Sequence, residues 1–230
     1  MTSNDRIYLR QVQLGPMANF VYLVGDPVTR KAAVVDPAWE VDRIIEFADA
    51  DGYKIDKILI THYHPDHLGG HLFGHDIQGT ADLLNKVKAK VYLNQHEADG
   101  AKQVAGLSDS DIAVMQAGDT IGLGDLEIKF LHTPGHTPGS QCFLIDGNLI
   151  SGDTLFVDSC GRVDLPGSDP EQMYHSLNHT LRNLDEATVV YPGHAYSPEP
   201  SSTIGAQKRT NAYMRFANLD DFLRAMGYAR

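Results

Sequence analysis

Thr61-His62-Tyr63-His64-Pro65-Asp66-His67 is the segment that decides the fold of this chain, and it directly follows a short apolar run. The apolar run predicts a buried strand, and the polar residues after it predict a loop. His62 and His64 alternate along an extended loop, so both can reach one metal ion. The turn at the proline directs Asp66 and His67 towards a neighbouring position. The segment therefore predicts two adjacent metal positions at the end of a strand.

Three more apolar runs end close to a residue that can bind a metal: residues 128–131 lead to His136, residues 149–150 to Asp153, and residues 189–191 to His194. If these strands lie side by side, their ends gather the polar residues at one sheet edge, where open α/β folds place their chemistry. Three histidines then serve one ion, one aspartate and two histidines serve the other, and Asp153 can bridge both. Imidazole and carboxylate ligands without thiolate suit zinc, iron or manganese. The remaining histidines are assigned to the surface or the core: His71, His75, His96, His132, His175 and His179.

The composition indicates one soluble domain that binds no nucleic acid. The 230 residues, 42% of them apolar, can bury a sizeable core. The formal charge of -11, from 19 basic and 30 acidic residues, lacks the basic surface that phosphate backbones require. Cys142 and Cys160 form no disulfide framework, so we expect a reducing, cytoplasmic location. The N-terminus predicts no signal peptide and no segment predicts a membrane span, so we expect no membrane partner.

Hydrophobic periodicity predicts alternating strands and helices. Sequence patterns predict strands over residues 7–14, 20–24, 31–35, 57–61, 91–93, 121–131, 141–145, 149–150 and 189–191. Helices are expected over 41–50, in part of 68–87, and from the Ser168-Asp169-Pro170 start signal to about residue 184. We expect a single domain over 1–230, with a substrate-side helical extension over about 200–230.

Five motifs together resemble the metallo-β-lactamase-fold superfamily, and within it glyoxalase II (hydroxyacylglutathione hydrolase) and its short relatives. The motifs are residues 61–67, 133–140, 151–156, 160–162 and 192–196. The resemblance implies an α/β fold of four layers, an αβ/βα sandwich with the metals at one edge. It places His62, His64 and His136 on a first metal, Asp66, His67 and His194 on a second, and Asp153 between them. True β-lactamases of the superfamily generally lack that aspartate, so the resemblance argues against antibiotic hydrolysis.

The resemblance implies a metal-dependent hydrolase that cleaves a thioester such as S-lactoylglutathione. Two divalent ions, zinc by preference, would hold a bridging hydroxide, with Asp66 and Asp153 as the catalytic carboxylates. Tyr196 matches a family tyrosine that contacts glutathione, and Arg162 stands at a family lysine. Lys208 and Arg209 resemble a basic glutathione-binding segment, although a solvated helix face explains them equally well. The implied partner is a small thioester molecule, and the sequence assigns no oligomeric state.

Other functions within the superfamily stay open. Residues 160–164 also resemble persulfide dioxygenases, which bind one iron through residues corresponding to His62, His136 and Asp153 and oxidise glutathione persulfide. Residues 151–156 and 164–170 look more like the hydrolase branch. A lactonase is a further alternative, whereas the intact ligand set argues against a noncatalytic scaffold.

Overall fold

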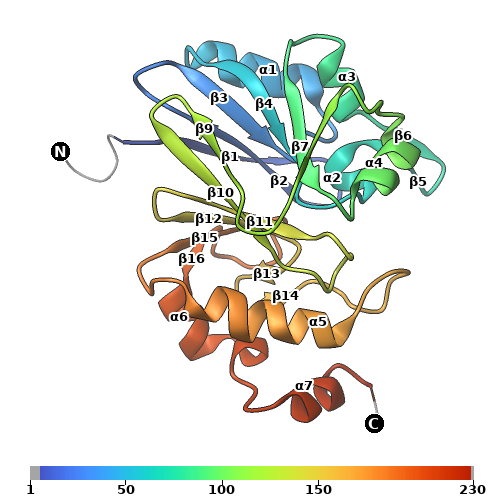
Figure 1. The fold of residues 1–230 in the computed structure, drawn as a ribbon, viewed down its shortest axis with the longest axis vertical. Coiled ribbons are helices and arrows are strands. Elements are labelled where there is room, and N and C mark those ends of the chain that lie inside the picture. Colours follow the sequence, from blue (N-terminus) through green and yellow to red (C-terminus); the bar gives the residue numbers. More distant parts are fainter. Residues whose placement is uncertain (1–5, 229–230) are drawn as a thin grey trace.

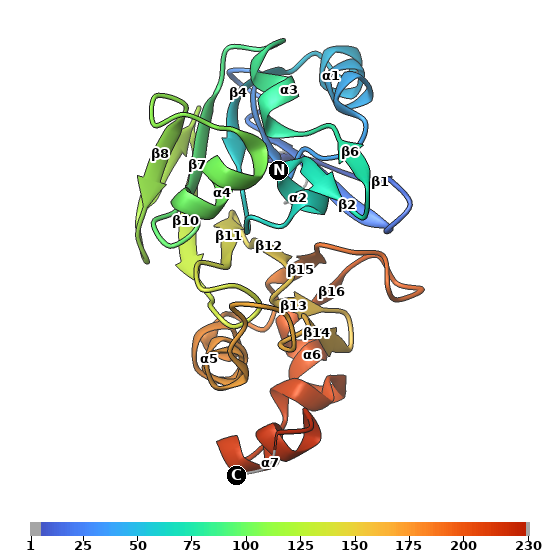
Figure 2. The same ribbon diagram turned by 90° about the vertical axis from the view of Figure 1, so that its right-hand side faces the viewer.

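Two six-stranded sheets pack face to face, and helices cover the outer face of each sheet (Figure 1). The computed structural model describes residues 6–228. From the outside inwards, the layers are helices, sheet, sheet and helices, which confirms the four-layer sandwich expected from the resemblance. Figure 2 shows the same two halves edge-on.

The first sheet contains the N-terminal strands. In spatial order they are β1 (Tyr8–Leu14), β2 (Asn19–Gly25), β3 (Lys31–Val35), β4 (Lys54–Leu59), β7 (Lys90–Asn94) and β8 (Ile112–Met115). The first three strands form an antiparallel meander, and β3, β4, β7 and β8 are parallel. The helices of this half are α1 (Val41–Ala50), α2 (Pro65–Leu68), α3 (Thr80–Leu84) and α4 (Ala98–Ala105).

The second sheet follows in the sequence. Its spatial order is β16 (Ser202–Thr203), β15 (Val189–Pro192), β12 (Asn148–Gly152), β11 (Gln141–Ile145), β10 (Leu126–His132) and β9 (Thr120–Leu123). All neighbouring pairs are antiparallel except β12 and β15, which are parallel. Two small hairpins lie outside the main sheets: β5 (Gly70–Leu72) with β6 (His75–Ile77), and β13 (Leu155–Phe156) with β14 (Ser159–Cys160).

Helices also cover the second sheet, and they end the chain. A helical run begins with α5 (Pro170–His175), continues through a π-helical turn, η2 (Ser176–Thr180), and ends in a 3₁₀ turn, η3 (Leu181–Asn183). The expected start is confirmed, since the Asp169 side chain accepts hydrogen bonds from the first backbone N–H groups. The last elements are α6 (Ile204–Thr210), the 3₁₀ turn η4 (Ala212–Met214) and α7 (Leu219–Ala225), which packs on α5 through Phe222 and Tyr174.

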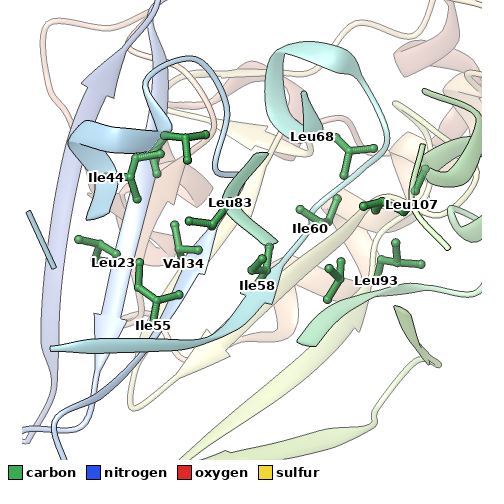
Figure 3. Packing of buried hydrophobic residues seen from close by; sticks show 14 of the residues in the cluster. Leu23, Val34, Ile44, Ile55, Ile58, Ile60, Leu68, Leu83, Leu93 and Leu107 are labelled. Carbon is green, nitrogen blue, oxygen red and sulfur yellow. The ribbon is translucent and has the colours of Figure 1, made fainter. Parts of the chain in front are cut away.

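Alternation along the central strands builds three apolar layers. In β2, Phe20, Tyr22 and Val24 face the other sheet, whereas Val21 and Leu23 face the helices of the first half. Figure 3 shows this outer layer, with side chains from β3 and β4 packed against Ile44 of α1 and Leu83 of α3. Within residues 6–228, no helix has the length and apolar character needed to cross a bilayer.

The structure differs from the sequence-based expectations in several segments. Residues 68–87 are partly helical as expected, with α3 inside them, but the β5–β6 hairpin precedes that helix. Helix α4, the β13–β14 hairpin and β16 were not expected. Residues 121–131, expected as one strand, are divided between β9 and β10 by a turn at Gly124, where φ is +61°. The edge strand β8 was not expected, because the run from Ile112 to Met115 is only four residues long.

One edge of the sandwich collects the ends of four strands. The loops that follow β4, β10, β12 and β15 carry, in order, His62, His136, Asp153 and His194. The first of these strands belongs to the first sheet and the other three to the second. The fold therefore brings polar residues from both sheets to one place, as the ends of the apolar runs predicted.

Candidate metal centre

Three histidines form the first group of potential ligands. His62, His64 and His136 each offer a ring nitrogen, and these atoms lie within 4.8 Å of one another. His64 Nδ1 is 3.0 Å from His136 Nε2. His62 Nε2 is buried and has no hydrogen-bond partner among the described residues. A buried ring nitrogen without a partner is costly unless a metal binds it, so this group fits a cation.

The second group contains Asp66, His67 and His194, whose ligand atoms also lie within 4.8 Å of one another. His67 Nε2 is 3.1 Å from His194 Nε2, and Asp66 Oδ2 is 3.4 Å and 3.5 Å from those two nitrogens, respectively. Pro65 occupies the first position of α2 and ends the extended segment, so Asp66 and His67 follow in the first turn of that helix. This is the turn that the sequence predicted.

Asp153 lies between the two groups. Its Oδ2 is 3.6 Å from His136 Nε2 in the first group and 3.4 Å from His194 Nε2 in the second. Its Oδ1 is buried without a hydrogen bond and lies 3.4 Å from His67 Nε2. A Cβ at Gly193 would overlap this oxygen, and one at Gly161 would overlap the Asp153 carbonyl. Glycine is therefore required at 193 by the carboxylate of Asp153 and at 161 by its backbone carbonyl.

The electrostatics of the cluster also favour a cation. Burial opposes the charge of Asp153, but His67 and His194 hold the pKa of that carboxyl well below its ordinary value. Burial likewise opposes the charge of His67, but the carboxylates of Asp153, Asp66 and Asp36 raise its pKa to about 10. The carboxylates thus attract a proton to His67 when no metal is bound. Divalent ions would neutralise the same carboxylates and leave the imidazole free to bind.

The histidines are oriented by their second ring nitrogens. His136 Nδ1 lies 2.8 Å from the Arg162 carbonyl oxygen, and His194 Nδ1 lies 3.0 Å from that of Met17. His67 Nδ1 lies 2.9 Å from Asp36 Oδ2. Such partners fix the ring orientation and the tautomer of a ligand histidine.

Asp36 is a functional residue that the sequence analysis missed. Its carboxylate accepts hydrogen bonds from the backbone N–H and hydroxyl of Thr61, and that hydroxyl lies 2.9 Å from His62 Nδ1. Asp36 therefore orients a histidine of each group, and both of its oxygens are occupied. The sequence contained a signal for this residue. Asp36 directly follows the apolar run of β3, in the same way that the metal ligands follow the apolar runs of their own strands.

Asn19 and Glu97 are two further residues without a sequence motif. Asn19 donates a hydrogen bond to Asp66 Oδ2 at 3.0 Å and accepts one from the Trp39 indole. Glu97 is fully buried and accepts hydrogen bonds from the Tyr63 backbone N–H at 2.6 Å and the Thr137 hydroxyl at 2.8 Å. Glu97 therefore ties together the two loops that supply the first group.

Of the substrate-binding residues expected from the resemblance, two lie at the cluster. The Tyr196 ring stacks on His194, with centroids 4.6 Å apart and planes at 8°, and the residue is 61% exposed. Burial raises the pKa of Tyr196 to about 12, helped by the charges of Asp153 and Asp66 and opposed by nearby Arg162. The Arg162 guanidinium is exposed and bound at 2.9 Å by both oxygens of Asp164.

The other two expected residues are not brought to the cluster. Lys208 Nζ lies 3.4 Å from Glu186. Glu186 precedes β15 and the metal ligand His194 follows it, so Lys208 lies near the opposite end of that strand from the ligand. Arg209 extends towards Gly205, beside the same glutamate. The structure thus groups Lys208 and Arg209 with each other and apart from the metal ligands.

Comparison with known proteins agrees with this geometry. Residues 14–194 match the family model described as the metallo-beta-lactamase superfamily. The chain is 35% identical to a hydroxyacylglutathione hydrolase of Rhodopseudomonas palustris over 91% of its own length and 75% of the relative's. It is 28% identical to the probable polyketide biosynthesis zinc-dependent hydrolase BaeB of Bacillus velezensis, over 90% of its length and 86% of the relative's.

A solved structure supports the same assignment at the level of the fold. The crystal structure of ETHE1 from Myxococcus xanthus superposes with a TM-score of 0.81 at 29% identity, covering 96% of this chain and 90% of that one. The family match spans the strands and loops that carry every proposed metal ligand. The chain therefore belongs to the metallo-β-lactamase superfamily of metallo-hydrolases.

Proposed function

We propose that this protein is a binuclear metal-dependent hydrolase that cleaves a thioester, of the kind represented by S-lactoylglutathione. The observation that carries the proposal is the position of Asp153, whose carboxylate lies between the two ligand groups and approaches histidines of both. In this proposal His62, His64 and His136 hold one ion and Asp66, His67 and His194 hold the other. Zinc is the proposed metal, because imidazole and carboxylate suit it and BaeB is named a zinc-dependent hydrolase.

The residues of the site divide the work of hydrolysis. Two divalent ions bound there supply Lewis acidity for a carbonyl oxygen and lower the pKa of a bound water towards about 7. Asp66, positioned by Asn19, takes up the proton of the attacking water. The hydroxyl of Tyr196 stays protonated at neutral pH, since its pKa is about 12, and so donates a hydrogen bond to the substrate.

A thioester suits this site because its leaving group needs little assistance. A thiolate is a more stable anion than an alkoxide, and no further acidic side chain is required to protonate it as it departs. The hydroxyacylglutathione hydrolase relative supports glutathione as the thiol carrier. Arg162 and Tyr196 would then contact the carrier, with Lys208 and Arg209 as more distant cationic contacts. The free cysteines Cys142 and Cys160 accord with a reducing, cytoplasmic location.

A second candidate is a mononuclear iron persulfide dioxygenase. The observation that favours it is that His62 Nε2 has no partner while His136 and Asp153 lie beside each other, 3.6 Å apart. These three residues alone would complete an iron site with open positions. In that case the second ligand group would remain without a metal.

The two candidates are separated by their products. Purified enzyme is given S-lactoylglutathione while released thiol is measured with a chromogenic thiol reagent, and glutathione persulfide while oxygen uptake is recorded with an electrode. Thiol release from S-lactoylglutathione, without oxygen uptake on glutathione persulfide, supports the hydrolase. Oxygen uptake without thiol release would replace it with the dioxygenase.

A further inference from the structure

An apolar groove of about 390 Å³ is lined in part by Met17, whose carbonyl oxygen lies 3.0 Å from His194 Nδ1. Its walls come from the turn between β1 and β2, from Trp39, and from the β5–β6 hairpin. The apolar side chains are Pro16, Met17, Trp39, Leu72, Phe73 and Ile77. His75 is the one ionisable residue in the lining, which contains no carboxylate, lysine or arginine. Its size lies within the range of small-molecule sites, and its lining favours an apolar ligand.

The groove and the metal centre share structural elements. The Met17 carbonyl accepts the hydrogen bond of His194 Nδ1, whereas Met17 also lines the groove. Trp39 lines the groove and donates its indole N–H to Asn19, which in turn donates to Asp66. One turn of the chain thus orients ligands of the second group and forms a wall of the groove.

Phe73 at the tip of the hairpin is unusual in two respects. It is 85% exposed, although a large apolar side chain at the surface has no solvation benefit. Its φ is +50°, a left-handed conformation that bulky residues rarely adopt. The positive φ follows from the hairpin, because Phe73 and Gly74 are the two turn residues between the paired Leu72 and His75. The exposure of the ring is not explained by packing, since the ring covers little of the protein itself.

We propose that the groove binds the apolar acyl chain of the substrate, which makes the preferred substrate a thioester whose acyl group is longer than lactoyl. This inference rests on the proposed thioester hydrolysis for the reacting bond. The charged thiol carrier is excluded from the groove, because burying its charges without partners there is unfavourable. The carrier lies instead at Arg162 and Tyr196, which do not line the groove. Phe73 closes over the acyl chain.

Binding is tested first, without catalysis. Trp39 is the only tryptophan of the chain and lines the groove, so its fluorescence reports the occupant directly. The metal-loaded enzyme is titrated with octanoate and, separately, with acetate. A saturable change in emission with octanoate and none with acetate is expected. Equal responses to the two acids, or none to either, would overturn the assignment of the groove.

Kinetics with S-acetylglutathione and S-octanoylglutathione provide the second test. Phe73→Asn removes the ring, and the variant is expected to fold because asparagine tolerates positive φ. We expect its KM to rise about tenfold for the octanoyl substrate and to be unchanged for the acetyl substrate. The control is Val28→Asn, which removes a side chain that is 77% exposed in the turn at the opposite end of β2.

The outcomes separate the two proposals. If both thioesters are cleaved with equal KM and Phe73→Asn changes neither, the groove does not bind the acyl chain, while thioester hydrolysis stands. If neither thioester is cleaved, the proposed function fails, and the fluorescence titration still decides whether the groove binds an apolar chain.

Discussion

Asp153 is the single residue on which the two-metal arrangement depends most. Its carboxylate approaches the Nε2 atoms of histidines in both groups, and glycine at 193 leaves room for it. An amide at this position would keep the size of the side chain and lose its negative charge. The second group would then retain one carboxylate, and the first group none.

We predict that Asp153→Asn loses metal and activity together. With its charge removed, the cluster binds cations less tightly, so metal content should fall below one ion per chain and kcat/KM by more than about 100-fold. Plasma mass spectrometry and the thiol-release assay measure both. Asp146→Asn, the same change in an exposed turn, is the control. Full activity in Asp153→Asn would show that the carboxylate does not serve the metals.

Arg162 and Lys208 were both expected at the thiol carrier, but the structure gives them different surroundings. We predict that Arg162→Ala raises KM for glutathione thioesters about tenfold, because a surface cation that pairs with a carboxylate of the carrier is lost. Lys208→Ala should change KM less, since Lys208 lies beside Glu186, which precedes β15, whereas the metal ligand His194 follows that strand. Steady-state kinetics on the two variants decide this. A larger effect at Lys208 would move the carrier to α6.

At the level of elements, the loop after β4 and the loop after β10 are held together by Glu97 at the start of α4. Its carboxylate accepts hydrogen bonds from Tyr63 and Thr137, and a further one from the Gly139 backbone N–H at 2.7 Å. Burial raises the pKa of Glu97 to about 7, although these hydrogen bonds favour the charged form. The connection between the loops is thus sensitive to protonation.

A pH-dependent contribution of Glu97 to stability follows. The folded protein keeps a proton on Glu97 up to about pH 7, whereas the unfolded chain releases it near 4.5. Glu97 therefore contributes stability at low pH, and this contribution is lost as the pH rises from 4.5 to 7, on the order of 3 kcal/mol in total. We compare the free energy of unfolding of the metal-free wild type with that of Glu97→Gln. The wild-type value minus the variant value should become smaller between pH 5 and pH 8.

Urea unfolding at the two pH values measures this difference. Glu127→Gln, an exposed glutamate of β10, controls for the loss of a negative charge. A difference that is constant or grows with pH would contradict the assignment. Independently of pH, Glu97→Gln places an amide N–H group against backbone donors, and it should cost about 1 to 3 kcal/mol.

Elements that were missed from the sequence share a physical cause. The β5–β6 hairpin is short and surrounded by glycines, and its pairing replaces a helix that the apolar spacing alone suggested. Glu97 and Asn19 act through tertiary contacts with residues far along the chain, which no local pattern records. The metal ligands were predictable because each follows a strand, and the ends of neighbouring strands meet at one edge.

At the scale of the whole molecule, each ligand group combines residues that follow strands of both sheets, so bound metals would cross-link the sheets. The first group combines His62 and His64, after β4 of the first sheet, with His136, after β10 of the second. The second group joins Asp66 and His67 to His194 in the same way. Metal binding and sheet packing are therefore coupled. The resemblance implied the four layers. The sequence could not show this coupling, because it does not tell which strand belongs to which sheet.

Removing the metals should destabilise the entire sandwich. Ligands that bind only the folded state stabilise it by mass action, so treatment with a chelator should lower Tm by about 10 °C or more, and added zinc should restore it. Differential scanning calorimetry measures the shift. Asp153→Asn should show a smaller shift than wild type. An unchanged Tm in wild type after verified metal removal would refute the cross-linking role.

The central claim is that this chain holds two metal ions for thioester hydrolysis. The most direct measurement is the metal content of the purified protein by plasma mass spectrometry, paired on the same sample with turnover of a glutathione thioester. Close to two divalent ions per chain, with release of thiol, is the predicted result. One iron per chain, with no thiol released, would contradict it.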